Sequence, residues 1–292
     1  MEHNSHFQGL LSGIEPDDKA VAKAKKSHEE LREILKNDPE ISKATPDTYL
    51  AGSYARDTAT NYIKDVDVVL LINLDHSKTS PNVAVAWVQA SLQEHYSEVT
   101  PQGRSVQVKT SSGFELDVVP SIPIGNRNGP ILIPDRDKKS WVASHPKGQI
   151  AFGVEKNQTT NGYYKPLVKL MKFWRDRFSN EDAKIKSYIL ENLVGENLTG
   201  EPSGYAVGVV SIFQNIYHRY ATYLNNRFVP RIVDLGYPSV NVAKRWKFNE
   251  FAAFMEEVRK SQSVASSALK AQNEAESLLL WRQLFGTKFE SK

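Results

Sequence analysis

The sequence predicts an α+β protein whose first half builds a mixed sheet and whose second half is helical. The run over residues 65–71 has the composition of a buried strand. Residues 105–122 alternate as a hairpin that turns at residues 111–113. From residue 165 onward, apolar residues recur every three or four positions, which indicates helices.

The composition limits the classes of protein to consider. The chain has 292 residues, 40% hydrophobic and 24% charged, enough for one large or two moderate domains. It contains no cysteine, which excludes disulfides, thiolate metal sites and cysteine nucleophiles. No apolar run is long enough to cross a bilayer and the N-terminus lacks a signal-peptide layout, so we expect a cytoplasmic protein without a membrane partner. The net charge of +3 suits an anionic substrate and gives little support for duplex nucleic acid as the main ligand.

The N-terminal elements follow from local patterns. Residues 1–16 are polar and are expected to form an arm or lid. A helix is predicted over residues 17–37, where apolar residues recur at helical spacing behind an aspartate at the N-cap. Residues 48–51 are predicted to be a strand, and a further helix is expected to open at Pro81. The apolar side of that helix is expected to hold Val83, Trp87, Val88 and Leu92.

The second half is predicted to be a helical lobe behind a bridging segment. Residues 123–162 are rich in proline, glycine and asparagine and are expected to be a loop-rich bridge. The first helix of the lobe, over residues 165–178, places one apolar stripe at Leu167, Leu170, Met171 and Trp174. Further helices are predicted over residues 186–197, 203–225, 249–260 and 278–285.

Two aspartates share one face of the predicted 65–71 strand. Asp65 and Asp67 are two residues apart and project from the same side, while Val66 and Val68 point to the other side, into a core. Adjacent like charges raise each other's pKa unless a cation neutralises them. Carboxylate oxygens are ligands that Mg²⁺ prefers. The pair indicates either a magnesium site or a strand end with two solvated acids.

A third aspartate lies in the returning strand of the predicted hairpin. Asp117 stands between Leu116 and Val118, where a lone buried carboxylate would cost on the order of several kcal/mol. If this strand lies beside the acidic strand, the three carboxylates converge and can hold two metal ions. The alternative is an aspartate that pairs with a nearby lysine or backbone amide.

A glycine–serine pair precedes these acids at a turn into a short helix. Gly52 permits close backbone approach, and the amides at the helix start can face an anion to which the Ser53 hydroxyl adds a contact. Alone, the pair is typical of a plain turn; with an aspartate pair twelve residues later, it indicates a phosphate site. Arg56 follows and either faces a triphosphate or pairs with Asp57 or a helix end.

Together these motifs resemble a known superfamily. Gly52-Ser53, eleven intervening residues, the acidic pair and a later aspartate resemble the nucleotidyltransferases of the DNA polymerase beta superfamily. Residues 167–174 and 186–190 resemble helices of oligoadenylate synthetase and cyclic GMP-AMP synthase. Their bacterial relatives are the cGAS/DncV-like nucleotidyltransferases, or CD-NTases, of the CBASS anti-phage systems. Similarity to clade D of that family extends to residues 135–138, 141, 145–146, 155–157 and 281–286.

The resemblance implies two domains with different roles. Residues 1–160 would form a polymerase-beta-like nucleotidyltransferase catalytic domain with a mixed sheet. Residues 161–292 would form a C-terminal helical nucleotide-binding domain. Asp65 and Asp67 would bind two Mg²⁺ ions, for which Mn²⁺ can substitute, and Asp117 would bind the ion that activates the acceptor hydroxyl.

The resemblance also implies the substrate contacts. They are Gly52, Ser53, Arg56, Lys169, Lys172, Ser187 and Tyr188. Ser53 and Lys172 would hold the triphosphate, and Ser187 would contact its β-phosphate. Tyr188 would stack on a base. Without the resemblance, Lys172 is typical of a snorkelling surface lysine and Tyr188 of a core aromatic.

The function implied is Mg²⁺-dependent condensation of ATP, and of other NTPs, into a cyclic di- or trinucleotide second messenger for anti-phage signalling, with release of pyrophosphate. Some members of the family need a HORMA-domain activator or DNA, so both are candidate partners. The alternatives are a terminal nucleotidyltransferase that acts on RNA or protein, and a non-catalytic sensor subunit that kept the fold. The residues leave open the NTPs, product, linkage, trigger and oligomeric state.

Overall fold

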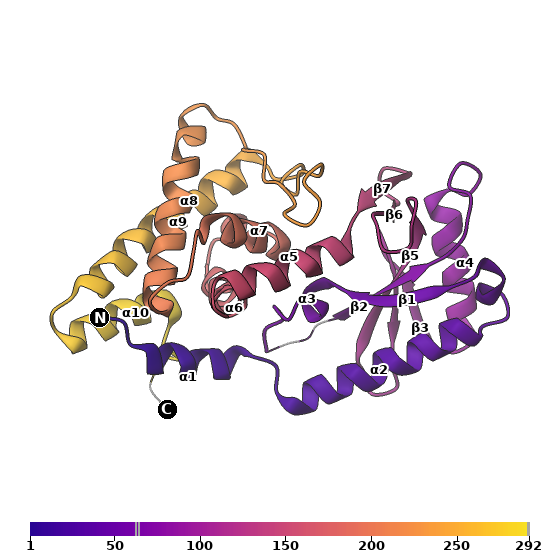
Figure 1. The fold of residues 1–292 in the computed structure, drawn as a ribbon, viewed down its shortest axis with the longest axis horizontal. Coiled ribbons are helices and arrows are strands. Elements are labelled where there is room, and N and C mark those ends of the chain that lie inside the picture. Colours follow the sequence, from indigo (N-terminus) through magenta and orange to yellow (C-terminus); the bar gives the residue numbers. More distant parts are fainter. Residues whose placement is uncertain (62, 64, 291–292) are drawn as a thin grey trace. The chain divides into compact units, whose positions relative to one another are not determined.

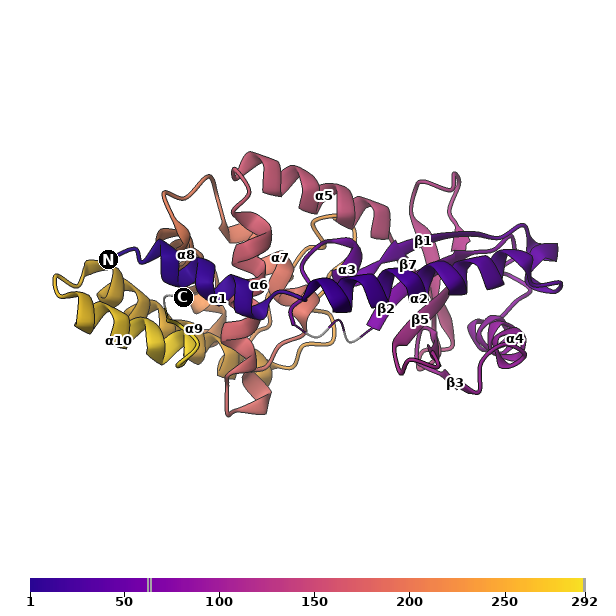
Figure 2. The same ribbon diagram turned by 90° about the horizontal axis from the view of Figure 1, so that it is seen from below.

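The computed structural model describes residues 1–61, 63 and 65–290 and divides the chain into two compact units (Figures 1 and 2). Residues 16–151 form the first, named here the sheet unit. Residues 1–15 and 152–292 form the second, named here the helical unit. Within the part of the chain described, no helix has the length and apolar composition needed to span a bilayer.

Over its described residues, the sheet unit is built around a seven-stranded sheet. Its strands are β1 (Asp47–Ala51), β2 (Asp65–Leu71), β3 (Glu98–Pro101), β4 (Val106–Lys109), β5 (Glu115–Pro123), β6 (Ile131–Asp135) and β7 (Ser140–Ser144). The order is β1-β2-β5-β4-β3, with β6 paired to β5 and β7 to β6. The β2–β5 pair is parallel and the other pairs are antiparallel, so the predicted mixed sheet is confirmed.

One face of this sheet is covered by helices of the same unit. They are α2 (Asp18–Asn37), the short α3 (Gly52–Ala55) and α4 (Pro81–Gln93), with a 3₁₀ turn at Ile41–Ala44. Val66 and Val68 of β2 pack with buried residues of α2 and α4 in one core. On α4 the predicted apolar side is wrong for Val83, which is 58% exposed, because the buried stripe runs instead through Val85 and Val88.

The expected loop-rich bridge over residues 123–162 is wrong. The structure places β6, β7 and α5 (Pro146–Thr159) there. Pro134 lies within β6, a strand whose main partner is the edge strand β7, and proline is tolerated near sheet edges. Glycine and proline content therefore concealed a short hairpin and a helix.

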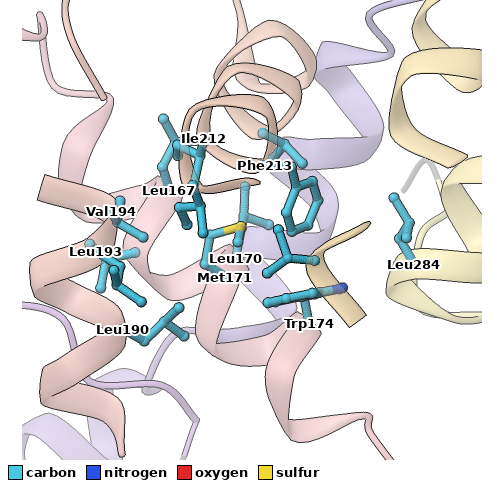
Figure 3. Close-up of a cluster of buried hydrophobic side chains, with 14 of the residues drawn as sticks. Leu167, Leu170, Met171, Trp174, Leu190, Leu193, Val194, Ile212, Phe213 and Leu284 are labelled. Atoms are coloured by element: carbon cyan, nitrogen blue, oxygen red, sulfur yellow. The ribbon is translucent and has the colours of Figure 1, made fainter. Parts of the chain in front are cut away.

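The helical unit packs its helices around one apolar core. They are α1 (Asn4–Ile14), most of α5, α6 (Tyr164–Asp176), α7 (Ser187–Asn197), α8 (Tyr205–Asn225), α9 (Phe248–Lys270) and α10 (Glu274–Phe285), with a 3₁₀ turn at Glu181–Ala183. The predicted stripe on α6 is confirmed: Leu167, Leu170 and Met171 are fully buried (Figure 3). Figure 3 shows this stripe meeting leucines of α7 and Phe213 of α8.

The first residues are not an arm or lid. In α1, four side chains at helical spacing are buried: Phe7, Leu10, Leu11 and Ile14. The Phe7 ring centroid lies 5.1 Å from that of Trp281, which belongs to α10. Residues 1–15 thus pack with the helical unit, although the expected division counted them with the catalytic domain. The polar residues between the four apolar ones hid the amphipathic pattern.

Candidate active site

The parallel pairing of β2 with β5 brings the predicted acids together. In this register Asp67 lies opposite Asp117, and Asp65 lies opposite Glu115. Side chains two residues apart on a strand share a face, so all four carboxylates lie on one side of the sheet. The condition set by the sequence, that the two acidic strands be neighbours, is met.

The turn at Gly52 is built against one of these acids. β1 pairs with β2 so that Ala51 lies opposite Asp67, and the chain then turns at Gly52 with φ of +70°. A Cβ at position 52 would lie 1.7 Å from Asp67 Oδ2, so glycine is required both by the left-handed backbone and by the contact. Ser53 is the next residue of α3.

Burial and mutual repulsion perturb the acids. Burial, reinforced by the charges of Asp65 and Asp117, raises the pKa of Asp67 to about 6. The positive charge of Arg56 opposes this rise. Burial also raises the pKa of Asp117; a hydrogen bond from Ser105 offsets part of that rise, and the charges of Asp65 and Glu115 add to it.

The close approach of these carboxylates indicates whether the site suits a divalent metal ion. Carboxylates that raise one another's pKa are stabilised when a cation neutralises them, and hard ions prefer carboxylate oxygen. Among the described residues, however, no three acidic or histidine side chains are preassembled into a metal site. The chemistry of the donor groups, carboxylate oxygens on one face of the sheet, fits a divalent ion.

Two residues at this site were missed in the sequence. Ser105, which is buried, donates a hydrogen bond of 3.1 Å from Oγ to Asp117 Oδ1. Glu115 is the fourth acid on the face and follows the two-residue alternation of its strand. The alternation could have identified Glu115. Ser105 precedes β4 by one residue, and its contact depends on how β4 pairs with β5.

The two predicted lysines lie in the helical unit and are buried. Lys172 is 4% exposed, and its Nζ lies 2.6 Å from Glu191 Oε1. Lys169 is 6% exposed, and its Nζ lies 2.9 Å from Glu15 Oε1. The alternative reading of Lys172 as a surface lysine is therefore wrong. Both glutamates were missed because each meets its lysine through tertiary packing.

Ser187 and Tyr188 open α7 and are half-buried. Arg175 donates to the Ser187 hydroxyl over 3.0 Å. The Tyr188 hydroxyl donates over 2.7 Å to Oδ1 of the buried Asp234. Tyr188 is therefore not a fully enclosed core aromatic. The predicted site residues are divided between the units, with the acids, Gly52, Ser53 and Arg56 in the sheet unit.

A mixed sheet that presents three aspartates beside a glycine–serine turn, in a chain with a second, helical unit, defines the class of nucleotidyltransferases. Residues 1–157 match the Second Messenger Oligonucleotide or Dinucleotide Synthetase domain. The chain is 33% identical over 299 residues to the cyclic AMP-AMP-AMP synthase of an Acinetobacter strain, covering 99% of this chain and 86% of that protein. It is 30% identical over 352 residues to the cyclic AMP-AMP-GMP synthase of Enterobacter hormaechei, covering 99% and 92%. The chain belongs to this family of bacterial second-messenger synthetases, the CD-NTases.

Solved structures agree on the fold. CdnC of Escherichia coli, solved with ATP, superposes with a TM-score of 0.81 at 16% identity, over 99% of both chains. CdnG of Bradyrhizobium diazoefficiens, solved with GTP, gives a TM-score of 0.78 at 16% identity, over 97% of this chain and 94% of that one. The predicted fold class is confirmed. As a family member, the protein is a nucleotidyltransferase that condenses nucleoside triphosphates into a cyclic oligonucleotide second messenger, and the family implies use of a divalent metal.

Proposed function

We propose that the product is a cyclic trinucleotide with at least two adenylates, made chiefly from ATP. Two relatives that align with nearly the whole chain are named for AMP-AMP-AMP and AMP-AMP-GMP products. The observation that carries the chemistry is the register that sets Asp67 opposite Asp117, with Gly52 against Asp67. That arrangement supports phosphoryl transfer at one face of the sheet unit.

Asp65, Asp67 and Asp117 are proposed to hold two Mg²⁺ ions, with Mn²⁺ as a substitute. When bound, such ions lower the pKa of the attacking ribose hydroxyl and neutralise the leaving pyrophosphate. Ser53 and Arg56 hold and orient the triphosphate of the donor, whose α-phosphate is attacked in line while pyrophosphate leaves. The hydrogen bond from Ser105 keeps the Asp117 carboxylate in one orientation on this face.

The helical unit is proposed to supply the remaining nucleotide contacts. Lys169 and Lys172 bind the triphosphate as point charges, Ser187 contacts the β-phosphate, and Tyr188 stacks on a base. Both lysines are ion-paired with glutamates. Triphosphate binding would therefore bring a phosphate oxygen to ammonium groups that already pair with a carboxylate.

A product assay tests the proposal. The protein is incubated with each labelled NTP and with all four, with Mg²⁺ or Mn²⁺, and the mixture is treated with phosphatase and analysed by mass spectrometry. A phosphatase-resistant trinucleotide rich in AMP is expected, and Asp67→Asn should yield none. Label transferred to added RNA would indicate terminal transfer instead. A cyclic dinucleotide would contradict the proposed product while leaving the class of enzyme intact.

We also propose that a HORMA-domain protein activates this enzyme. One similar structure is the complex of Escherichia coli CdnC with a HORMA protein; that CdnC gives a TM-score of 0.80 at 17% identity, over 99% of this chain and 98% of that one. The test compares product formation by the protein alone, with a HORMA-domain protein, with duplex DNA and with both. Full turnover by the protein alone would contradict this proposal, and stimulation by DNA alone would assign the trigger to nucleic acid.

A further inference from the structure

In the helical unit, a loop whose residues the family does not imply holds the hydroxyl of Tyr188, and this loop is named here the anchor. The anchor is the loop that joins α8 to α9, which follows Asn225 and ends before Phe248 (Figure 1). Asp234 lies in this loop and is 3% exposed. Its Oδ1 accepts the Tyr188 hydroxyl over 2.7 Å.

The acceptor itself is fixed by the loop backbone. Oδ1 of Asp234 also accepts the backbone N–H groups of Gly236, over 2.9 Å, and Tyr237, over 3.1 Å. This is an Asx turn, in which an aspartate side chain closes its own loop. Because the carboxylate is buried and holds the turn, it cannot follow a moving phenol. The hydroxyl end of the Tyr188 ring is therefore tied to a rigid point.

A second contact fastens the same loop to the same helix. Asn192, one turn after Tyr188 on α7, accepts the N–H of Leu235 through Oδ1 over 2.8 Å. Its Nδ2 donates to the backbone carbonyl of Tyr188 over 2.7 Å. At Gly195 a Cβ would lie 2.7 Å from Leu235 Cδ1, so the helix and loop are in close contact there as well. The loop is thereby held against α7 along two turns of helix.

We propose that Asp234 is a positioning residue for nucleotide binding, which fixes the direction of the long axis of the Tyr188 side chain before a base arrives. The inference rests on the proposed function, in which Tyr188 stacks on a base. A side chain held at both its Cβ and its hydroxyl keeps one χ1 rotamer, so it has already lost the side-chain swing that stacking would otherwise remove. The ligand group that Asp234 helps to bind is the nucleobase of an NTP. The anchor does not contribute to binding of the triphosphate.

The test measures binding of a non-hydrolysable ATP analogue and of inorganic tripolyphosphate to the full chain. Tyr188→Phe keeps the ring and removes the donor, and Asp234→Ala removes the acceptor. Each substitution should weaken binding of the ATP analogue about three- to tenfold, and the double variant should bind it no more weakly than either single variant. The affinity for tripolyphosphate should not change in any of these variants. Asp234→Asn keeps an acceptor oxygen and should restore near-normal binding.

A matched control separates positioning from loss of loop structure. Asn241 fixes the same loop through Oδ1, which accepts the N–H groups of Ile232 and Ala243, and it makes no contact with the Tyr188 hydroxyl among its described hydrogen bonds. Asn241→Ala should leave the affinity for the analogue near normal. Equal losses in Asn241→Ala and Asp234→Ala, or unchanged binding by Tyr188→Phe, would overturn the inference. Unchanged binding by Tyr188→Ala would instead refute the proposed stacking role itself.

Discussion

Replacing Asp67 by asparagine should stabilise the metal-free protein while abolishing its activity. The pKa of Asp67 is raised from 3.8 to about 6 by burial and by Asp65 and Asp117. One pKa unit corresponds to about 1.4 kcal/mol, so the ionised carboxylate lowers the free energy of unfolding by at most about 3 kcal/mol. Asparagine has nearly the same shape and no charge. We therefore expect a gain of up to about 3 kcal/mol near pH 7.5 in the presence of a chelator.

The sign of the effect gives its pH dependence. Because the pKa in the folded state exceeds that in the unfolded state, the folded protein binds the proton more tightly. The penalty is fully present above about pH 6 and disappears as the pH falls through 6 toward 3.8. The gain in Asp67→Asn should therefore vanish near pH 4. Denaturant unfolding at both pH values, without metal, measures it.

Activity and a control complete this experiment. Asp67→Asn should lose about a thousandfold or more of its turnover, as expected when a charge-stabilising group is removed from a reaction centre. Glu98, in β3, carries an exposed carboxylate paired with Lys109 on the same sheet, so Glu98→Gln should change stability by less than about 1 kcal/mol at either pH. An Asp67→Asn variant that is less stable than wild type at pH 7.5, or that keeps near-normal turnover, would refute the reasoning.

Three further substitutions test other parts of the structure. Gly52→Ala would place its Cβ on the Asp67 carboxylate and should lose at least about a hundredfold in turnover. The control Gly113→Ala, where φ is +75° and the space is open, should cost only about 1–2 kcal/mol of stability. Equal activity of the two variants would contradict the close contact between Gly52 and Asp67. Lys172→Met leaves Glu191 buried without its cation and should lower the free energy of unfolding, measured in urea, by about 3–5 kcal/mol. The double variant with Glu191→Met should recover most of that stability and none of the activity. Additive losses of stability would argue against the ion pair. Phe7→Ala should cost about 3–5 kcal/mol, measured by the same unfolding, because α1 is part of a core; a change below about 1 kcal/mol would mean that α1 is dispensable.

The strong local patterns of the sequence were sufficient for most elements. The acidic strand, the hairpin, the helix over residues 17–37 and the stripe on α6 were all predicted near their observed bounds. The errors fell where two local signals competed. Proline and glycine concealed β6 and β7, and polar neighbours concealed the apolar face of α1. Val83, predicted on the apolar side of α4, is 58% exposed, and Trp87 on the same predicted side is only half-buried.

By itself, the sequence determined the chemical groups of the site and their local order: two aspartates on one strand face, a third on a later strand, and a glycine–serine turn before them. These depend on spacing within one strand or one turn, which the chain carries in its own alternation. Only the tertiary structure decided what each group meets. The parallel register that sets Asp67 against Asp117, the Glu191 carboxylate on Lys172 and the anchoring of Tyr188 by Asp234 all join residues distant in sequence. Such pairs form because burial requires each polar group to find a partner, and that partner is chosen by packing.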